Sequence, residues 1–348
     1  MRLPRAKAWL LVGIPLVVLA ALRFVATGAS ASAPTRIYVT NYLDNTVSVI
    51  DGGDNAVVAT VRVGRAPAGI AVSPDHRFVY IANSESDTVS VLDSASNRIA
   101  STVALPRGSG PVGLALSPDG RQVYAADGGS NRVSVINTRT RRVVASVRVG
   151  RQPLSVAVSP NGSTLYLANS GSGNLSVINA HTLHAAETIP TGQFPSGVAV
   201  TPDGRSVYVT NELSDVTVVN PATRTVEAHL DAPSPFGLAL SPDGSRAYIA
   251  DLGPGNVTVI DTRVHHISAT VPIGPPGTDP FSAQATGDAI YVVDQGANRL
   301  SVIDANSLSV AATVSTGVVM ISATGIVSRT SWVRGRRAWT PRRTSFSR

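Results

Sequence analysis

An internal repeat of about 42 residues constrains the fold of this chain more than any other feature of its sequence. The stretch GIAVSPDHRFVYIANSESDTVSVLD, residues 69–93, returns as GLALSPDGRQVYAADGGSNRVSVIN, residues 113–137. One tyrosine marks the register of each copy: Tyr38, Tyr80, Tyr124, Tyr166, Tyr208, Tyr248 and Tyr291. The spacings are 42, 44, 42, 42, 40 and 43 residues, so there are seven copies. Repeats of this length are typical of solenoids, propellers and arrays.

Each copy contains four short phrases, such as GIAVSP, FVYIAN, TVSVLD and RIASTVAL. They are rich in Val, Ile and Tyr and are bounded by Gly, Pro, Asn, Asp or Ser, which is typical of β-strands. The sequences SPDG, SPNG and TPDG between the first and second phrases are tight-turn sequences. No segment of the repeat has the length and the 3.6-residue period of a helix. Four antiparallel strands in each of seven copies predict an all-β, seven-bladed β-propeller.

The two ends of the repeat region predict how the ring closes. The N-terminal copy begins directly at its second strand, RIYVT at 36–40, while a weak extra first strand, ATGIVS, stands at 323–328. We therefore expect the C-terminal strand to complete the N-terminal blade, which leaves no free sheet edge between the ends. The predicted propeller domain spans residues 34–328. First strands of the other copies are expected to begin near Ala68, Val112, Ser155, Gly197, Gly237 and Ser282.

Both segments outside the repeats are rich in arginine or apolar residues. Residues 1–33 combine a basic leader, the apolar run WLLVGIPLVVLAAL and small residues in A-x-A spacing, which predicts a signal peptide. Because Arg23 directly follows the run, an uncleaved membrane anchor stays open as an alternative. In either case we expect a protein outside the cytoplasm: secreted, at the cell surface, or anchored and facing outward.

The tail at residues 329–348 holds seven arginines, no acid and no strand or helix period. We expect it to be disordered and exposed. Three further interpretations stay open: attraction to an anionic cell-wall polymer or lipid, adventitious nucleic-acid binding, and an altered reading frame. The membrane is an expected partner only if the N-terminal segment is not cleaved.

The net charge of +7 comes from the two ends of the chain. Between Arg36 and Ser328 there are 18 basic and 22 acidic residues, a balance of −4, so we do not expect nucleic-acid binding by the propeller. The absence of cysteine excludes disulfides, thiolate metal sites and cysteine nucleophiles.

Several phrases identify a family. YVTN at 38–41 and 208–211, YIAN at 80–83, the VSVID-like runs and the pattern P-x-G-x-A-V-[ST]-P-[DN]-G resemble the YVTN-type β-propeller repeat family, which includes the YncE-like proteins. The resemblance extends from Arg36 to about Ser328. It implies the propeller fold and an exported or surface-associated protein, but says little about activity, because this fold is similar to quinoprotein dehydrogenase propellers and sugar lactonases.

Positions filled alike in all seven copies are expected to serve folding, whereas a single binding site should appear as asymmetry. Seven Asx residues follow the second strands: Asn41, Asn83, Asp127, Asn169, Asn211, Asp251 and Asp294. They could form a ring of ligands, but we expect them to cap turns by bonding their own backbone. The seven repeat tyrosines are likewise expected to pack between blades.

The candidates for catalysis are few. The six histidines fall in turns or outer strands, none at the face where connecting loops surround the channel, and no G-x-S-x-G, zinc or dinucleotide motif is present. An oxygen-ligated cation stays open through four acids of the loop face: Glu85, Asp87, Glu212 and Asp215. We expect no catalytic residue, no metal and no cofactor.

Asymmetry appears just before the first strands. Three copies carry Arg65, Arg107 and Arg151 there, and three later copies carry Phe194, Phe236 and Phe281. If the ring closes, one side of its mouth is cationic and the other aromatic, which suits an anionic ligand with an apolar part. The alternative is scattered surface arginines and phenylalanines that fill the channel.

Two functional hypotheses follow. The first is an exported, monomeric, non-enzymatic binding or scaffold propeller that holds a small ligand, a cell-wall polymer or a protein at the loop face around the channel. The second is a lactonase-like or quinoprotein-like enzyme that uses a channel-bound cation or cofactor.

Overall fold

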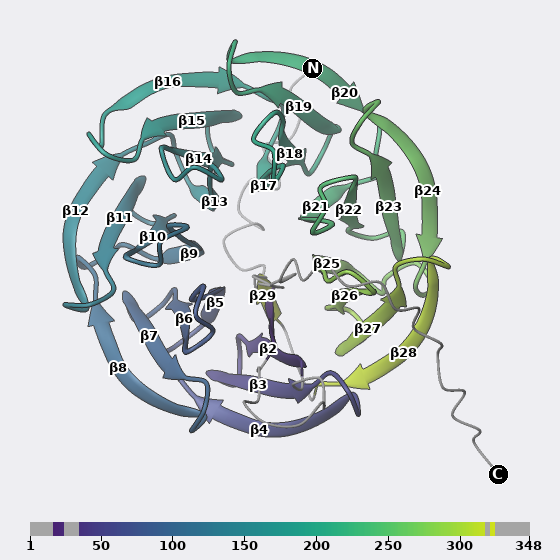
Figure 1. The fold of residues 1–348 in the computed structure, drawn as a ribbon, viewed down its shortest axis with the longest axis horizontal. Coiled ribbons are helices and arrows are strands. Elements are labelled where there is room, and N and C mark those ends of the chain that lie inside the picture. The colour runs from purple at the N-terminus through teal and green to yellow at the C-terminus, as the bar shows by residue number, and fades with distance from the viewer. Residues whose placement is uncertain (1–16, 24–34, 317–320, 324–348) are drawn as a thin grey trace, which may run out of the picture.

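The computed structural model describes residues 17–23, 35–316 and 321–323. All regular structure within them is β, and its strands form seven sheets arranged as blades around one axis (Figure 1). Blades 2 to 7 have four antiparallel strands each, in sequence order from the axis outward. The predicted seven-bladed all-β propeller is therefore confirmed.

Every inner strand of blades 2 to 7 begins with proline. These strands are β5 (Pro67–Val72), β9 (Pro111–Leu116), β13 (Pro153–Val158), β17 (Pro195–Val200), β21 (Pro235–Leu240) and β25 (Pro280–Ala285). The second strands of blades 1 to 7 carry the repeat tyrosines and are β2 (Thr35–Asn41), β6 (Phe78–Asn83), β10 (Gln122–Asp127), β14 (Thr164–Asn169), β18 (Val207–Asn211), β22 (Arg246–Asp251) and β26 (Ala289–Asp294).

The third and outer strands complete each blade. The third strands are β3 (Thr46–Asp51), β7 (Thr88–Asp93), β11 (Arg132–Asn137), β15 (Asn174–Asn179), β19 (Val216–Asn220), β23 (Asn256–Asp261) and β27 (Arg299–Asp304). The outer strands are β4 (Ala56–Arg62), β8 (Arg98–Ala104), β12 (Arg142–Arg148), β16 (Ala185–Pro190), β20 (Thr225–Leu230), β24 (His266–Pro272) and β28 (Ser309–Ser315). Second and third strands are buried on both faces between neighbouring blades, whereas outer strands such as β24 alternate between exposed and covered residues.

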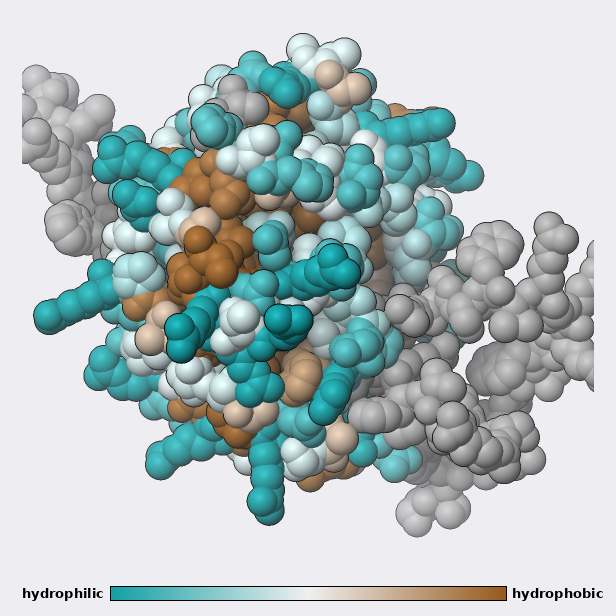
Figure 2. All heavy atoms as spheres, turned by 60° about the vertical axis from the view of Figure 1, so that its left-hand side comes forward, coloured by the Kyte–Doolittle hydropathy of each residue, from teal (hydrophilic) through white to brown (hydrophobic). Residues whose placement is uncertain are grey.

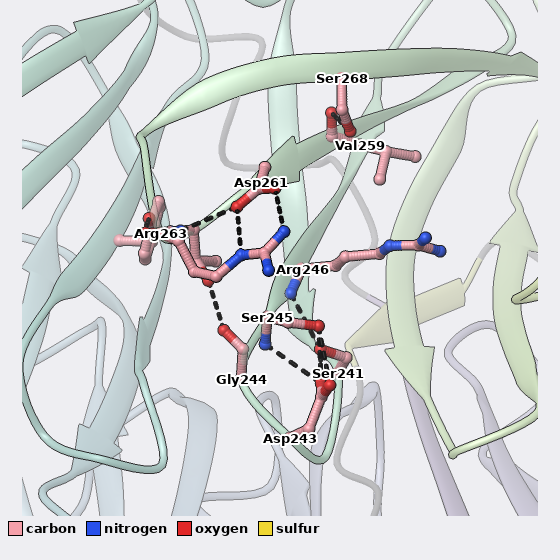
Figure 3. A network of polar contacts seen from close by, with 11 residues as sticks. Ser241, Asp243, Gly244, Ser245, Arg246, Val259, Asp261, Arg263 and Ser268 are labelled. Atoms are coloured by element: carbon pink, nitrogen blue, oxygen red, sulfur yellow. Dashed lines mark hydrogen bonds and ion pairs between the residues drawn. The ribbon is translucent and has the colours of Figure 1, made fainter.

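The turn between the first and second strands is built by its own side chains. In blade 6, Ser241 Oγ donates to Asp243 Oδ1 at 2.6 Å and accepts from the backbone N–H of Arg246 at 2.9 Å (Figure 3). Gly244 takes the left-handed φ of +72° that the turn requires. The hydrogen bond from Ser241 holds the pKa of Asp243 below its usual value. The Ser-Pro-Asp-Gly sequence thus specifies the turn locally.

Close packing around the axis explains the glycine of the P-x-G pattern. A Cβ at Gly113 would lie 2.6 Å from the carbonyl oxygen of Leu154, and one at Gly197 would lie 2.9 Å from that of Phe236. Neighbouring inner strands therefore touch backbone to backbone, and only glycine leaves room for this approach. The repeat tyrosines pack between blades as expected: Tyr80, for example, joins Leu114 and Val123 of the next blade in one buried cluster.

Both ends of the chain contribute to blade 1. Strand β1 (Val17–Arg23) pairs antiparallel with β2 over five positions, from Leu19 opposite Val39 to Arg23 opposite Thr35. Strand β29 (Ile321–Ala323) pairs with the other end of β2, at Thr40 and Asn41. Both strands also contact β5 and β25, the inner strands of the two neighbouring blades. The ring therefore closes at blade 1, with the C-terminal strand pairing there as predicted. β29 pairs with two residues of β2 and β1 with five, however, and of the predicted strand at 323–328 only residue 323 lies within the described residues.

The part played by β1 differs from the sequence-based expectation. The apolar run that contains Val17–Leu22 has the composition of a buried strand as well as that of an export signal, so composition alone does not separate the two. Residues 1–16 and 24–34 of the predicted signal segment, and the whole predicted tail at 329–348, lie outside the described residues. Within the described residues, no helix has the length and apolar character needed to cross a membrane.

Candidate functional site

The central channel contains a cavity of about 280 Å³ lined by the inner strands of blades 2 to 7. Its described lining includes no Asp, Glu, Lys, Arg or His. Its polar side chains are three hydroxyls and one amide, those of Ser155, Ser196, Ser282 and Gln284. The rest of the lining is aliphatic, aromatic or glycine, but polar atoms make up slightly more of the exposed wall than apolar atoms do, so the channel offers an uncharged environment of mixed polarity.

Two of the three candidate phenylalanines meet in this channel. The ring centroids of Phe236 and Phe281 lie 4.1 Å apart with the planes inclined at 41°. Both side chains line the cavity, and both also pack into the buried seam with Ile37 and Val39 of blade 1. Phe194 lies in the loop before β17, with a left-handed φ of 55°, and is not part of the cavity lining.

The three candidate arginines lie in exposed loops and do not line the cavity. Arg65 Nη2 donates to the carbonyl oxygen of Glu85 at 2.8 Å. The backbone N–H of Arg151 donates to Ser172 Oγ at 2.6 Å. Arg107 stands in a loop whose glycine N–H groups donate to the Asp87 carboxylate, Gly108 at 2.7 Å among them. The structure thus brings Phe236 and Phe281 together but not the arginines, and a ligand-binding role for these six residues stays a prediction.

The loop-face acids have partners that separate them. Asp215 accepts hydrogen bonds from Asn211 Nδ2 at 2.6 Å and His229 Nδ1 at 2.7 Å, and Asp87 caps the loop before β9. Burial raises the pKa of Glu212. Within the part of the chain that the structure describes, no three His, Cys, Asp or Glu side chains converge as metal ligands.

The seven Asx residues after the second strands bond across to the third strand, not chiefly to their own backbone as expected. Asn83 Nδ2 donates to Ser90 Oγ at 2.9 Å, and Thr258 Oγ1 donates to Asp251 Oδ2 at 2.7 Å. All seven are buried. The expectation of own-backbone caps was wrong because these side chains point along the sheet, where a Ser or Thr of the next strand is within reach. They brace each blade through the other side-chain atom, whereas Oδ1 of all of them except Asn83 is buried without a hydrogen-bond partner among the described residues.

Where the bracing residue is Asp, burial changes its acidity. Burial raises the pKa of Asp127 and of Asp251 to about 7. Burial also raises the pKa of Asp294, to about 6, although Arg299 Nε donates to it at 2.8 Å. Three blades thus contain an acid that titrates near neutrality.

Sequence reasoning missed the polar lining of the channel. Ser155 and Ser282 occupy the repeat position that is glycine in Gly69, Gly113, Gly197 and Gly237. Serine in place of glycine in two copies breaks the repeat at the axis. This difference could have identified Ser155 and Ser282 from the sequence alone.

Comparison with known proteins gives a family and a fold. The family profile described as YNCE-like beta-propeller matches residues 4–105 and 155–251, and the profile of the cytochrome D1 heme domain matches residues 89–198. No curated protein matches the chain significantly. Hydrazine synthase from Kuenenia stuttgartiensis is similar in structure, with a TM-score of 0.71, 26% identity, and coverage of 78% of this chain and 92% of that one.

Two further solved structures share the fold at lower identity. Dihydro-heme d1 dehydrogenase NirN, in complex with DHE, has a TM-score of 0.61 and 16% identity, with 81% of this chain and 64% of that chain covered. Virginiamycin B lyase from Staphylococcus aureus has a TM-score of 0.61 and 17% identity, with 69% and 81% covered.

Two of these matches, the cytochrome D1 heme domain and dihydro-heme d1 dehydrogenase, are named for a heme group, so the residues of the channel are compared with those that bind haem. Haem iron in proteins takes axial ligands from His, Cys, Met or Tyr side chains. The described cavity lining contains none of these four residue types. The residues that surround this channel therefore do not fit a haem site.

Proposed function

Because this chain belongs to the YncE-like β-propeller family, we propose that it is an exported binding propeller that holds a small, uncharged ligand in its central channel and catalyses no reaction on it. The observation that carries the proposal is the channel cavity of about 280 Å³ with the Phe236–Phe281 pair in its wall. Concave sites with aromatic side chains and a few well-placed polar groups are typical of small-molecule binding.

The charge of the ligand follows from the lining. A charged group moved from water into an apolar cavity loses several kcal/mol of hydration unless an opposite charge meets it there. The described lining supplies no such charge. Ser155 offers a hydroxyl for orienting a neutral polar group. An anionic ligand with an apolar part would have to keep its charge outside this cavity.

The same lining supports binding over catalysis. General acid–base catalysis and nucleophilic catalysis need a titratable side chain beside the reacting atoms. A cation-dependent enzyme would need carboxylate or imidazole donors facing the channel. The described lining has neither, so no observation at the channel favours the enzymatic alternative.

Export is supported by the basic leader, apolar run and small-residue site of residues 1–33. The proposal expects a mature chain that begins just after Ala31 or Ala33. Mass spectrometry of the protein recovered outside the cytoplasm measures the position of its N-terminus. A chain that stays uncleaved in the membrane fraction would indicate the anchor instead.

Channel binding is tested with the neutral fluorescent probe N-phenyl-1-naphthylamine. We expect saturable binding, weakened in Phe236→Leu by about three- to tenfold, because aromatic contacts are worth about 0.5–1.5 kcal/mol. The matched control is Phe78→Leu, the same change at a residue that does not line the channel. Circular dichroism confirms that both variants fold. Equal probe affinity in the two variants would contradict the proposal.

A further inference from the structure

The charge of the ring is divided unevenly among its blades. Residues 65–151 hold 11 Arg and 6 acids, a balance of +5, whereas residues 152–316 hold 5 Arg and 13 acids, a balance of −8. Most of the excess lies in blade 3 and the loop after it, because residues 111–151 hold 7 Arg and 2 Asp. Figure 2 brings β8, β12 and β16 forward, and long hydrophilic side chains stand out from this side.

Arginines in the two halves also differ in their partners. In the acidic half, four of the five arginines lie within 4.0 Å of a carboxylate oxygen: Arg205, Arg224, Arg263 and Arg299. In the basic half, only Arg121 does, 3.7 Å from Asp119. Across β11 and β12, Arg132 and Arg148 stand directly opposite each other, a repulsive pairing. Among the described residues, the charge of blade 3 is thus largely uncompensated.

A pocket of about 500 Å³ opens between blades 2 and 3, at the end of the ring that carries the Ser-Pro-Asp-Gly turns. Phe78, Thr138 and Arg139 belong to its wall. The guanidinium carbons of Arg77 and Arg141 lie 5.1 and 5.5 Å from the centroid of the Phe78 ring. Contact with an aromatic ring holds a guanidinium in place. Arg141 Nη1 also donates to the carbonyl oxygen of Ala100 at 3.2 Å, so its remaining N–H groups are the ones that can reach a ligand.

This aromatic platform is specific to one blade. The residues that correspond to Phe78 in the other copies are Arg36, Gln122, Thr164, Ser206, Arg246 and Ala289. Residues that serve folding are expected to repeat in every copy, and Phe78 does not. Phe78 is therefore a candidate site residue.

The two acids in the pocket wall are engaged by their own turns. Asp75 Oδ1 accepts the backbone N–H of Arg77 at 3.0 Å, and Asp119 Oδ1 accepts that of Arg121 at 3.0 Å. The side-chain hydrogen bond from Ser117 holds the pKa of Asp119 below its usual value. Both carboxylates therefore stay ionised, but each already serves as an acceptor within its turn.

The equivalent pocket between blades 5 and 6, of about 660 Å³, provides a comparison. There Arg263 occupies the repeat position of Arg139, and Asp261 accepts its Nε at 3.1 Å and its Nη2 at 2.6 Å (Figure 3). The side-chain hydrogen bond from Arg263 lowers the pKa of Asp261 to about 2. In blade 3 the residue in the place of Asp261 is Asn137, which is neutral and accepts from Thr140 N at 2.8 Å. Because blade 3 has Asn137 where blade 6 has Asp261, Arg139 has no carboxylate partner among the described residues.

We propose that the pocket between blades 2 and 3 binds the phosphate group of an anionic ligand through Arg77, Arg139 and Arg141. Guanidinium groups donate paired N–H bonds that match the oxygens of phosphate. The three arginines come from the turn of blade 2 and from the third-to-fourth turn of blade 3, so both blades hold the anion. The site lies at the opposite end of the fold from the loop face and does not depend on the proposed channel ligand.

Isothermal titration of the full chain with inorganic pyrophosphate tests the site. We expect Asn137→Asp to lower the affinity about tenfold or more, because it recreates the blade 6 ion pair and removes Arg139 from the ligand. Arg139→Gln should have a similar effect, and provides a second variant if Asn137→Asp folds poorly. Arg263→Gln is the matched control and should bind as the wild type does. The terminal arginines are the same in every variant and contribute only a common background.

A second arm uses vesicles that carry phosphatidylinositol phosphate and tests whether a lipid headgroup presents the phosphate. Binding to pyrophosphate or to these vesicles supports the site if it is lost in Asn137→Asp and kept in Arg263→Gln. Equal losses in Arg139→Gln and Arg263→Gln would show diffuse attraction by surface charge and overturn the proposal. The absence of binding to both probes would overturn it as well.

Discussion

The buried acid Asp251 shows how one residue sets a pH dependence. It ends β22 at a position where Asn41, Asn83, Asn169 and Asn211 stand in four other blades. Burial raises its pKa to about 7, from a value near 3.8 in the unfolded chain. Between these pH values the folded protein binds more protons than the unfolded one, so its stability falls as pH rises from about 4 to about 7.

Asp251→Asn should therefore stabilise the protein at pH 8, by about 1–3 kcal/mol, and leave its stability at pH 4 nearly unchanged. The free energy of unfolding in urea at the two pH values measures this. Asp243→Asn is a control of opposite sign, because the hydrogen bond from Ser241 lowers the pKa of Asp243 and its loss should cost stability at pH 8. Stabilisation of equal size at both pH values would contradict the account of Asp251.

At the scale of the strand, the inner elements depend on glycine at the axis. Gly113→Ala places a Cβ 2.6 Å from the Leu154 carbonyl and 2.9 Å from Ser155 Cα, so β9 and β13 must separate. We expect a loss of about 1–3 kcal/mol in the free energy of unfolding, the range for overpacked sites. Gly287→Ala is the matched control, since nothing lies within 4 Å of a Cβ there. Similar stability in both variants would show that the inner strands shift apart freely.

The strands were the best predicted part of the molecule because their signals are local. Pro, Gly and Asx residues mark the ends of nearly every phrase, so the predicted starts of the six inner strands fall within two residues of the observed ones. β1 was not foreseen, since its six apolar residues, Val17–Leu22, suit a strand and an export signal equally. The partners of the Asx residues were missed because a bond from Asn83 to Ser90 depends on strand register, which a local turn signal does not contain.

The candidate site was predicted less well than the fold. All six candidates were predicted at the mouth of the channel. Phe236 and Phe281 do line it because they lie in inner strands, but Phe194 and the arginines precede such strands in loops whose direction the sequence does not specify. The pocket of Phe78 and Arg139 joins residues about sixty positions apart. The net charge of the whole propeller also gave no sign of this pocket, because the acids of blades 5 to 7 cancel the arginines of blade 3.

At the scale of the whole molecule, the two chain ends pair with separate parts of β2 and also with each other, so their contributions to stability should be coupled. We compare the melting temperatures of the full chain, a chain without residues 1–33, a chain without residues 317–348 and a chain without both. The double truncation should lower the melting temperature by less than the two single truncations added together, because each single truncation already removes the pairing between β1 and β29. Additive effects would mean that the two ends act independently.

If residues 1–33 act as the proposed export signal, the position of β1 also has a consequence for the order of events in the cell. A segment that must be threaded through a secretion channel has to stay unfolded, and the same seven residues cannot simultaneously be hydrogen-bonded to β2. A ring that folded before translocation would conceal its own leader and remain inside. Rapid delivery, or a chaperone that delays folding, would release the protein with its leader accessible to the peptidase. Under the proposed export, the rate at which blade 1 folds relative to the rate of translocation would thus determine where this protein resides.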